Sequence, residues 1–407
     1  MSASGELMAA VRWPRSCEVR DPPYIHSGAS SEQTYWLFCV AAVPVMAAGA
    51  WVFGYGIVAV YVSAALGALL GERVCRYFVS HGSRSRFPHA MAMGLMLAMT
   101  LPPTVGLGIP LVGGFLGIVI GKVVLGGMGN YLWHPALVGW ALVHLISPGA
   151  LAPARWPFLA AGHGLTGSLE AVMVGAGYRG FGLTVPPPGV EAWSTPRPID
   201  RLIGAYSAPV ADGGADRSLL SVFRDHLPPW SDTVWGVAGG GIGETCAVAV
   251  LVGGLVLIFC RASRWQLPVA ALGTVAVLAA VWPVRVDAGL AGGAPGAPGL
   301  GQAASPASAL WFPILSVREG FPVGVAAVLF HLTGGGLLTA CFLIAPDPVS
   351  TPLSGRGHLL FGVGLGALAF VGRVSGLTPG SVYWAILAMN TVVPVIDRIT
   401  RRRVPGA

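Results

Sequence analysis

Residues 96–121 read MLAMTLPPTVGLGIPLVGGFLGIVIG, an apolar run that breaks at two prolines and resumes as a glycine-rich segment. The same order of features returns at residues 339–366, TACFLIAPDPVSTPLSGRGHLLFGVGLG. Downstream of each copy, GGMGNYLWHPALVGWALV (126–143) parallels SGLTPGSVYWAILAMNTV (375–392). Chance likeness between segments rich in glycine, proline and leucine is the alternative. The matching order of break and helix favours an internal repeat, one copy in each half of the chain.

The composition places this repeat in a membrane. The chain has 407 residues, of which 54% are hydrophobic and 10% charged, and its mean hydropathy is +0.70. Soluble domains carry about 25% charged residues. A chain this long and apolar is predicted to be a polytopic membrane protein. Its net charge of +7 is better explained by membrane orientation than by nucleic-acid binding, so no nucleic acid is expected as a partner.

Ten apolar segments are predicted to span the bilayer as helices, which makes the fold all-α. They cover residues 35–53, 57–70, 91–101, 109–124, 135–146, 242–260, 267–281, 323–343, 359–374 and 381–395. Each half then holds five spans. Because five is odd, a direct sequence repeat gives two inverted five-helix repeats, a design that places sites at broken helices near the midplane.

Arginines set the expected orientation. Arg73, Arg76, Arg261 and Arg264 follow the second and sixth spans, and the chain ends in DRITRRRVPGA. These segments share one side, which should be cytoplasmic, together with both termini. The N-terminus lacks the apolar region of a cleaved signal peptide. The predicted domains are a cytoplasmic tail (1–34), the first repeat (35–146), an extracytoplasmic loop (147–241), the second repeat with an outer Gly/Pro-rich loop at 285–322 (242–398), and a basic cytoplasmic tail (399–407).

The first candidate site is the glycine run Gly126, Gly127, Gly129 with Asn130, just before a helix that opens with a His-Pro pair. Glycines let the backbone approach a ligand, and a helix N-terminus offers free N–H groups. Re-entry of the chain, with glycine chosen for packing, is the alternative. His134 could be a ligand or a structural buried histidine.

Two acids stand at further breaks. Gly243 and Glu244 belong to GGGIGET (239–245), and Asp347 lies between prolines in APDPVSTP (345–352). A carboxylate at membrane depth is costly unless paired or hydrated, so both acids are candidates for an ion path. Capping of a helix start by Glu244 and turn formation by Asp347 are the competing interpretations. No catalytic triad or P-loop is present, and the six scattered cysteines do not favour an iron–sulfur or zinc site.

Taken together, five collinear segments resemble the RnfD/NqrB family of integral membrane subunits, and the RnfD branch in particular. They are PPYIHSGASSEQTYW (22–36), LMLAMTLPPTVGLGIP (95–110), GKVVLGGMGNYLWHPALVGWAL (121–142), GGIGETCAVAVLVGGLVLIFCRASRWQLPVA (240–270) and FHLTGGGLLTACFLIAPDPVSTPLSGRG (330–357). The resemblance implies ten helices in two inverted halves, similar to urea transporters. It departs from the family pattern at His89, His134 and Pro346.

In that family a flavin mononucleotide is bound through its phosphate to a threonine in an outward loop. EAWSTPRPID (191–200) aligns with the acceptor pattern and puts Arg197 at the acceptor position. A guanidinium cannot form a phosphoester. Three outcomes stay open: non-covalent FMN paired with Arg197, attachment to Ser194 or Thr195, or a site that has lost its flavin.

The resemblance further implies a subunit, without activity of its own, of a redox-driven translocase in a bacterial inner membrane. Its expected partners are the bilayer and the other Rnf-type subunits, both membrane and peripheral, which carry flavin and iron–sulfur centres. Electrons would pass through flavin, with riboflavin as a possible second cofactor, coupled to movement of Na⁺ or H⁺. A urea-transporter-like solute channel and a purely structural subunit are the alternatives.

Overall fold

The computed structural model describes most of the helical body of the chain. The described residues are 30–78, 87–103, 105–127, 129–151, 199, 202–203, 230–235, 241–282, 284–287, 308–311, 323–377 and 380–400. Arg197, Ser194 and Thr195 lie outside them, as do most of the two long loops and both tails.

The first half begins with two long helices, α2 (Ser31–Phe53) and α3 (Gly56–Phe78). Ser30 starts α2 with a capping box, in which its hydroxyl accepts from the Gln33 amide while the Gln33 side chain accepts from the Ser30 amide. The remaining elements are α4 (Phe87–Met99), α5 (Gly108–Leu116), the π-helix η1 (Gly117–Val124), α6 (Pro135–Ile146) and the short 3₁₀ helix η2 (Pro148–Ala150).

The second half has a matching series of helices with one more break. After the short α10 (Trp230–Trp235) come α11 (Ala247–Phe259), α12 (Gln266–Val281), α13 (Val323–Thr333), α14 (Leu337–Thr339), the π-helix η6 (Ala340–Ile344), α15 (Gly355–Val374) and α16 (Ser381–Thr400). Two short strands, β1 (Val284–Asp287) and β2 (Ser308–Trp311), pair antiparallel across the predicted outer loop. That pairing was not expected from a Gly/Pro-rich loop.

All ten predicted apolar segments contain helices in the structure. Four helices, α2, α3, α15 and α16, are long and apolar enough to cross a membrane alone. A fifth crossing results if α13 and the α14–η6 pair, which bend by 53° at their break, form one span. The other five predicted segments are shorter apolar helices. The protein is therefore a mainly helical, multi-pass membrane protein.

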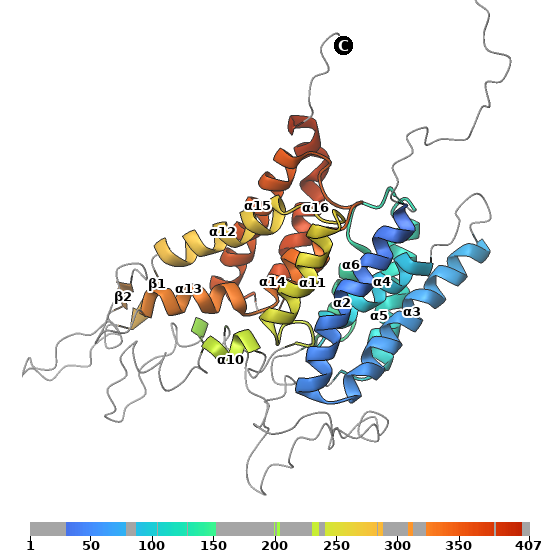
Figure 1. The fold of residues 1–407 in the computed structure, drawn as a ribbon, viewed down its shortest axis with the longest axis horizontal. Coiled ribbons are helices and arrows are strands. Elements are labelled where there is room, and N and C mark those ends of the chain that lie inside the picture. The colour runs from blue at the N-terminus through green and yellow to red at the C-terminus, as the bar shows by residue number, and fades with distance from the viewer. Residues whose placement is uncertain are drawn as a thin grey trace, which may run out of the picture.

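The two halves show the same pattern of helix packing. Figure 1 shows α3, α4 and α5 on one side of the molecule and α12, α13 and α15 on the other. In the first half, α3 packs on α4 and α5, and α6 packs on α5 and η1; in the second, α12 packs on α13 and α15, and α15 packs on α16. Helices α2 and α11 join the halves. Gly253 of α11 permits this contact, because a Cβ there would overlap the carbonyl oxygen of Ala41 on α2.

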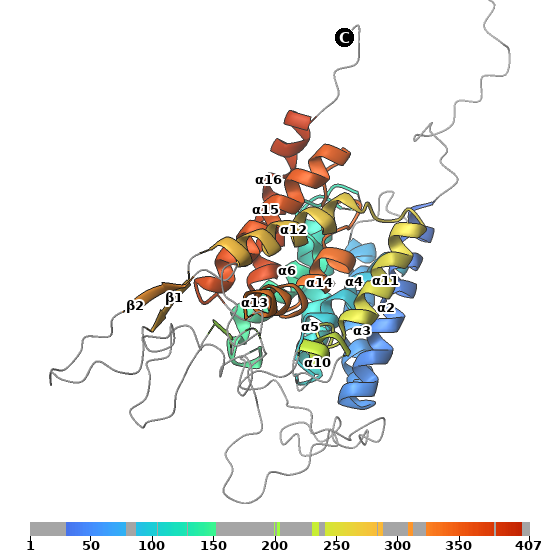
Figure 2. The same ribbon diagram turned by 60° about the vertical axis from the view of Figure 1, so that its left-hand side comes forward.

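The helices α2, α16 and α10 mark the two ends of the helical body (Figure 1). The N-terminal end of α2 and the C-terminal end of α16 lie at the same end in both views, and α10 lies toward the other (Figures 1 and 2). The outer surface keeps large apolar side chains exposed, including Trp51, Leu145 and Ile399. Such a surface suits lipid rather than water.

Candidate functional site

The glycine run before α6 is a tight reversal of the chain. Gly126, Gly127 and Gly129 have φ values of +130°, +83° and +86°, which side chains other than glycine rarely adopt. The Gly127 amide donates to the Lys122 carbonyl at 2.7 Å, which closes the end of η1. The Asn130 amide donates in turn to the Gly127 carbonyl at 3.2 Å. Backbone conformation alone accounts for these glycines, and open space remains beside Gly127 and Gly129.

Asp347 is the centre of a polar cluster that joins the two halves of the chain. It is fully buried and accepts hydrogen bonds from two tyrosines of the other half: Tyr35 at 3.1 Å, and Tyr131 at 3.1 and 3.0 Å. Its own turn supplies the Ser350 hydroxyl and amide, each at 3.0 Å, and the Val349 amide at 3.3 Å. These donors satisfy the oxygens of the buried carboxylate.

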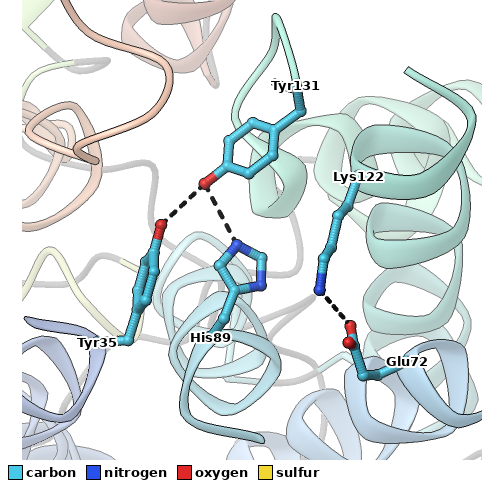
Figure 3. A network of polar contacts seen from close by, with 5 residues as sticks. All are labelled: Tyr35, Glu72, His89, Lys122 and Tyr131. Atoms are coloured by element: carbon cyan, nitrogen blue, oxygen red, sulfur yellow. Dashed lines mark hydrogen bonds and ion pairs between the residues drawn. The ribbon is translucent and has the colours of Figure 1, made fainter. Parts of the chain in front are cut away.

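Two histidines lie close to this cluster. His89 Nε2 is 3.3 Å from the Tyr131 hydroxyl, and its ring packs edge-on against Tyr35 (Figure 3). His134 is also fully buried. With the Asn390 amide in its better orientation, its oxygen accepts from the His134 amide at 3.1 Å and its nitrogen donates to the Ser350 carbonyl at 3.1 Å. The cluster therefore joins the break before α6 to the break before α15.

The second acid lies at a different junction. Glu244 is half-buried, and its carboxylate accepts from the Tyr383 hydroxyl at 3.1 Å and from the Gly241 amide at 3.4 Å. Gly336, with φ of +69°, lies against Glu244 and Tyr383, since a Cβ there would be 2.7 Å from Glu244 Oε1 and from the Tyr383 hydroxyl oxygen. The Gly243 carbonyl accepts from Thr339. Glu244 thus lies where the loop before α11 meets the break between α13 and α14.

The same loop also contacts the first half through its backbone. The Ile242 amide donates to the Leu101 carbonyl at 3.2 Å, and the Gly243 amide donates to the Met99 carbonyl at 3.0 Å. The breaks that the sequence predicts after α4 and before α11 therefore face each other. A broken helix leaves unpaired backbone groups in an apolar medium, and mutual pairing satisfies them.

A buried arginine satisfies the break between α13 and α14. Arg373 of α15 is 1% exposed and donates to the carbonyls of His331 at 2.5 Å, Gly334 at 2.7 Å and Gly335 at 3.3 Å. A cation suits the carbonyl end of a helix. Ile199, the described residue nearest in sequence to Arg197, is buried against Gly334 and Gly335. Within the flavin-attachment motif predicted at residues 191–200, Ile199 is therefore packed at this break.

Another buried carboxylate has a cationic partner. Glu72 of α3 accepts from the ammonium of Lys122 on η1 at 2.6 Å, and both side chains are less than a tenth exposed (Figure 3). Lys122 is the only lysine of the chain. This bond involves neither Asp347 nor its tyrosines. It fixes α3 against the π-helix.

The structure brings together only part of the predicted set. Asp347 and Glu244 lie at separate junctions, the Gly126–Asn130 reversal is linked to Asp347 through Tyr131, and Gly243 adjoins Glu244. Among the described residues, no group of three or more His, Cys, Asp or Glu side chains could hold a metal ion. Sequence reasoning missed Tyr35, Tyr131 and Tyr383. Lys122 and Arg373 carried a usable signal, a charge inside an apolar segment.

Known proteins resemble this chain over nearly its whole length. The family model described as "NQR2, RnfD, RnfE family" matches residues 18–406. A subunit of the ion-translocating oxidoreductase complex of Stutzerimonas stutzeri is 30% identical, with 90% of each chain covered. A subunit of the proton-translocating ferredoxin:NAD(+) oxidoreductase complex of Clostridium ljungdahlii is 27% identical, with 94% of each covered. An ion-translocating oxidoreductase complex subunit from Salmonella paratyphi A is 27% identical over 95% of this chain and 98% of its own. This chain belongs to the NQR2, RnfD, RnfE family.

Proposed function

We propose that this chain is a membrane subunit of an Rnf-like, ion-translocating oxidoreductase complex. The relatives are named as subunits of such complexes, and the match covers nine-tenths or more of each chain. The observation that carries the ion-translocating part is Asp347, a fully buried carboxylate with tyrosine, serine and amide donors at the junction of the two halves. An ionisable group at this depth marks an ion pathway in a membrane protein.

The fold we propose is ten spans in two inverted five-helix repeats, similar to urea transporters. Its support is the matching packing of α3 with α4 and α5 and of α12 with α13 and α15. The facing breaks at residues 99–101 and 242–243 add to it. Both termini would lie in the cytoplasm of a bacterium and the loop at 147–241 outside its inner membrane. Labelling of single cysteines placed in that loop, with a reagent that cannot cross the membrane, tests this topology.

The flavin that we propose is a non-covalent FMN whose phosphate pairs with Arg197, with Ser194 and Thr195 as nearby donors. A guanidinium suits a phosphate as a bidentate partner. Ile199 supports the location: it is packed at the Gly334–Gly335 break, and two peptide units extend only about 7 Å. A bound flavin supplies the electron transfer, and the protein positions it. We propose that the Gly126–Asn130 reversal and the Gly243–Glu244 loop form walls of the flavin site. The same walls are proposed for riboflavin as a second flavin, because open space adjoins Gly127 and Gly129.

In this proposal Glu244 and Asp347 are two stations of the ion path. They lie at different junctions: Glu244 is half-buried, and Asp347 is fully buried. The other subunits of the complex, with flavin and iron–sulfur centres, would supply and accept the electrons. A solute channel is the alternative that a loss of flavin would favour, and a structural subunit is the third.

Absorption spectra of this chain, purified without the other flavin-carrying subunits, test the flavin. We expect flavin bands in the native protein, and release of the flavin from this chain on denaturation. Absence of flavin bands both before and after denaturation would remove the redox role and leave the structural one.

Arg197→Thr tests the attachment site. Co-expressed with the flavin-attaching enzyme, the variant should show flavin fluorescence on a denaturing gel, whereas the unaltered chain should show none. Label on the unaltered chain would instead make Ser194 or Thr195 the acceptor.

Uptake of a small amide such as urea by liposomes tests the channel alternative. Equal uptake with and without the complex would count against a solute channel.

A further inference from the structure

His134 is buried in a way that packing alone does not explain. It precedes α6 and its side chain is fully buried. Neither ring nitrogen has a hydrogen-bond partner among the described residues. A neutral imidazole always carries one N–H donor and one lone pair, and leaving both unsatisfied in an apolar interior costs about 1–3 kcal/mol each. The ring thus retains an unused capacity to accept and donate a proton.

Asp347 is the buried carboxylate at the same junction as this ring. Asn390 links the two residues, because it bonds the His134 backbone amide on one side and the Ser350 carbonyl on the other. Ser350 in turn donates to Asp347. An ionised carboxylate stabilises a proton that arrives on a neighbouring imidazole.

We propose that His134 and Asp347 together form a site that binds and releases one proton, so that the ion handled at this junction is H⁺. This inference rests on the ion-translocating role proposed above. A proton arriving on a ring nitrogen gives an imidazolium beside the carboxylate. Its transfer to Asp347 gives a carboxylic acid and restores the neutral ring, and its departure restores the carboxylate. The net charge of the pair alternates between −1 and 0.

The groups around the pair favour a proton over sodium. Tyr35, Tyr131 and Ser350 all point hydroxyl hydrogens at Asp347, so their oxygens are arranged as donors. A hard cation instead needs several oxygen ligands turned toward it. His89 adds a second imidazole next to Tyr131, and the thiol of Cys39 bonds the Pro88 carbonyl. From α16, the neutral side-chain amide of Asn390 bonds the His134 amide and the Ser350 carbonyl.

The complete complex, reconstituted in liposomes, tests the proposal. During electron transfer, a trapped pH indicator reports proton movement and radioactive sodium reports sodium movement. We expect proton movement that persists without added sodium. In His134→Gln, which cannot exchange a ring proton, protons moved per electron should fall at least about tenfold, within what a positioned proton-transfer group contributes. Trp133→Phe is the matched control, because it removes only a bond to Thr391 and should retain full coupling.

The outcomes separate this site from the general function. An unaltered complex that transfers electrons but moves no ion overturns the translocating role itself. Movement of sodium in place of protons, or full proton coupling in His134→Gln, overturns the proton site and leaves that role standing. If His134→Gln does not assemble, infrared difference spectra of the unaltered complex on reduction decide. Paired changes in imidazole and carboxylic-acid bands that shift in D₂O support the site, and their absence overturns it.

Discussion

Asp347 and Glu244 each follow a glycine- or proline-rich break, yet the fold treats them differently. Asp347 is fully buried and accepts from two tyrosines, a serine hydroxyl and two amides. Glu244 is half-buried, and its contacts include the Tyr383 hydroxyl and, at a longer distance, the Gly241 amide. The depth of burial, which distant elements set, separates the two carboxylates. A local motif does not reveal that depth.

Removing the Asp347 carboxylate should have the largest effect. In Asp347→Ala, the hydroxyls of Tyr35, Tyr131 and Ser350 lose a buried acceptor. At about 1–3 kcal/mol for each unsatisfied donor, the free energy of unfolding should fall by about 5 kcal/mol. Denaturant unfolding of the detergent-solubilised complex measures it. Asp347→Asn, which keeps one acceptor oxygen, should lose less. A loss no greater than that of Glu244→Ala would show that the two acids are held alike.

Glu72 sharpens the comparison, because its partner is a cation instead of neutral donors. Lys122→Met leaves a buried carboxylate unpaired and should lower the free energy of unfolding by about 3 kcal/mol. The double change Glu72→Gln/Lys122→Met removes both charges and should regain most of that loss. The same unfolding assay compares the two variants. Equal stability of the single and double variants would mean that the ion pair does not hold α3 on η1.

Gly336 tests whether the contacts of Glu244 depend on a glycine. An alanine Cβ there would lie 2.7 Å from Glu244 Oε1 and from the Tyr383 hydroxyl, at a φ of +69°. Gly336→Ala should therefore cost about 2 kcal/mol in unfolding free energy and reduce redox-driven ion uptake.

Gly376→Ala is its matched control, since its φ is +79° but nothing lies within 4 Å of the added Cβ. Backbone strain alone should cost it about 1 kcal/mol, with ion uptake unchanged. Identical losses in the two variants would argue that Glu244 moves aside at no cost.

Glu244→Gln should have the smallest effect on stability, below about 1 kcal/mol, because the side chain is half-buried and an amide oxygen can still accept from Tyr383. Its effect on transport should be larger. Ion uptake by liposomes containing the complex should fall while electron transfer between soluble donor and acceptor persists. Normal uptake would exclude Glu244 from the ion path and leave Asp347 as the single station.

Much of the fold follows from patterns along the chain. The apolar segment predicted at residues 135–146 coincides with the helix α6, and the segment at 323–343 forms α13 followed by the bent α14–η6 pair. The π-helices η1 and η6 were not predicted, because a π turn differs from an α turn only in its hydrogen-bond partners. Of the candidate sites, Asp347 and Glu244 were found as isolated acids. Their tyrosine donors were not, since a tyrosine in an apolar run looks like any core aromatic.

The sequence by itself determined that this is a multi-pass membrane protein of a known family, where its apolar helices run and where they break. Hydropathy, glycine and proline act over short stretches, so their consequences can be read locally. Only the tertiary structure decided which polar groups meet. Tyr35 reaches Asp347 across 312 residues of sequence, and Arg373 reaches the carbonyls of another helix. Buried donors and acceptors must find partners in space, and no periodicity along the chain records which ones they find.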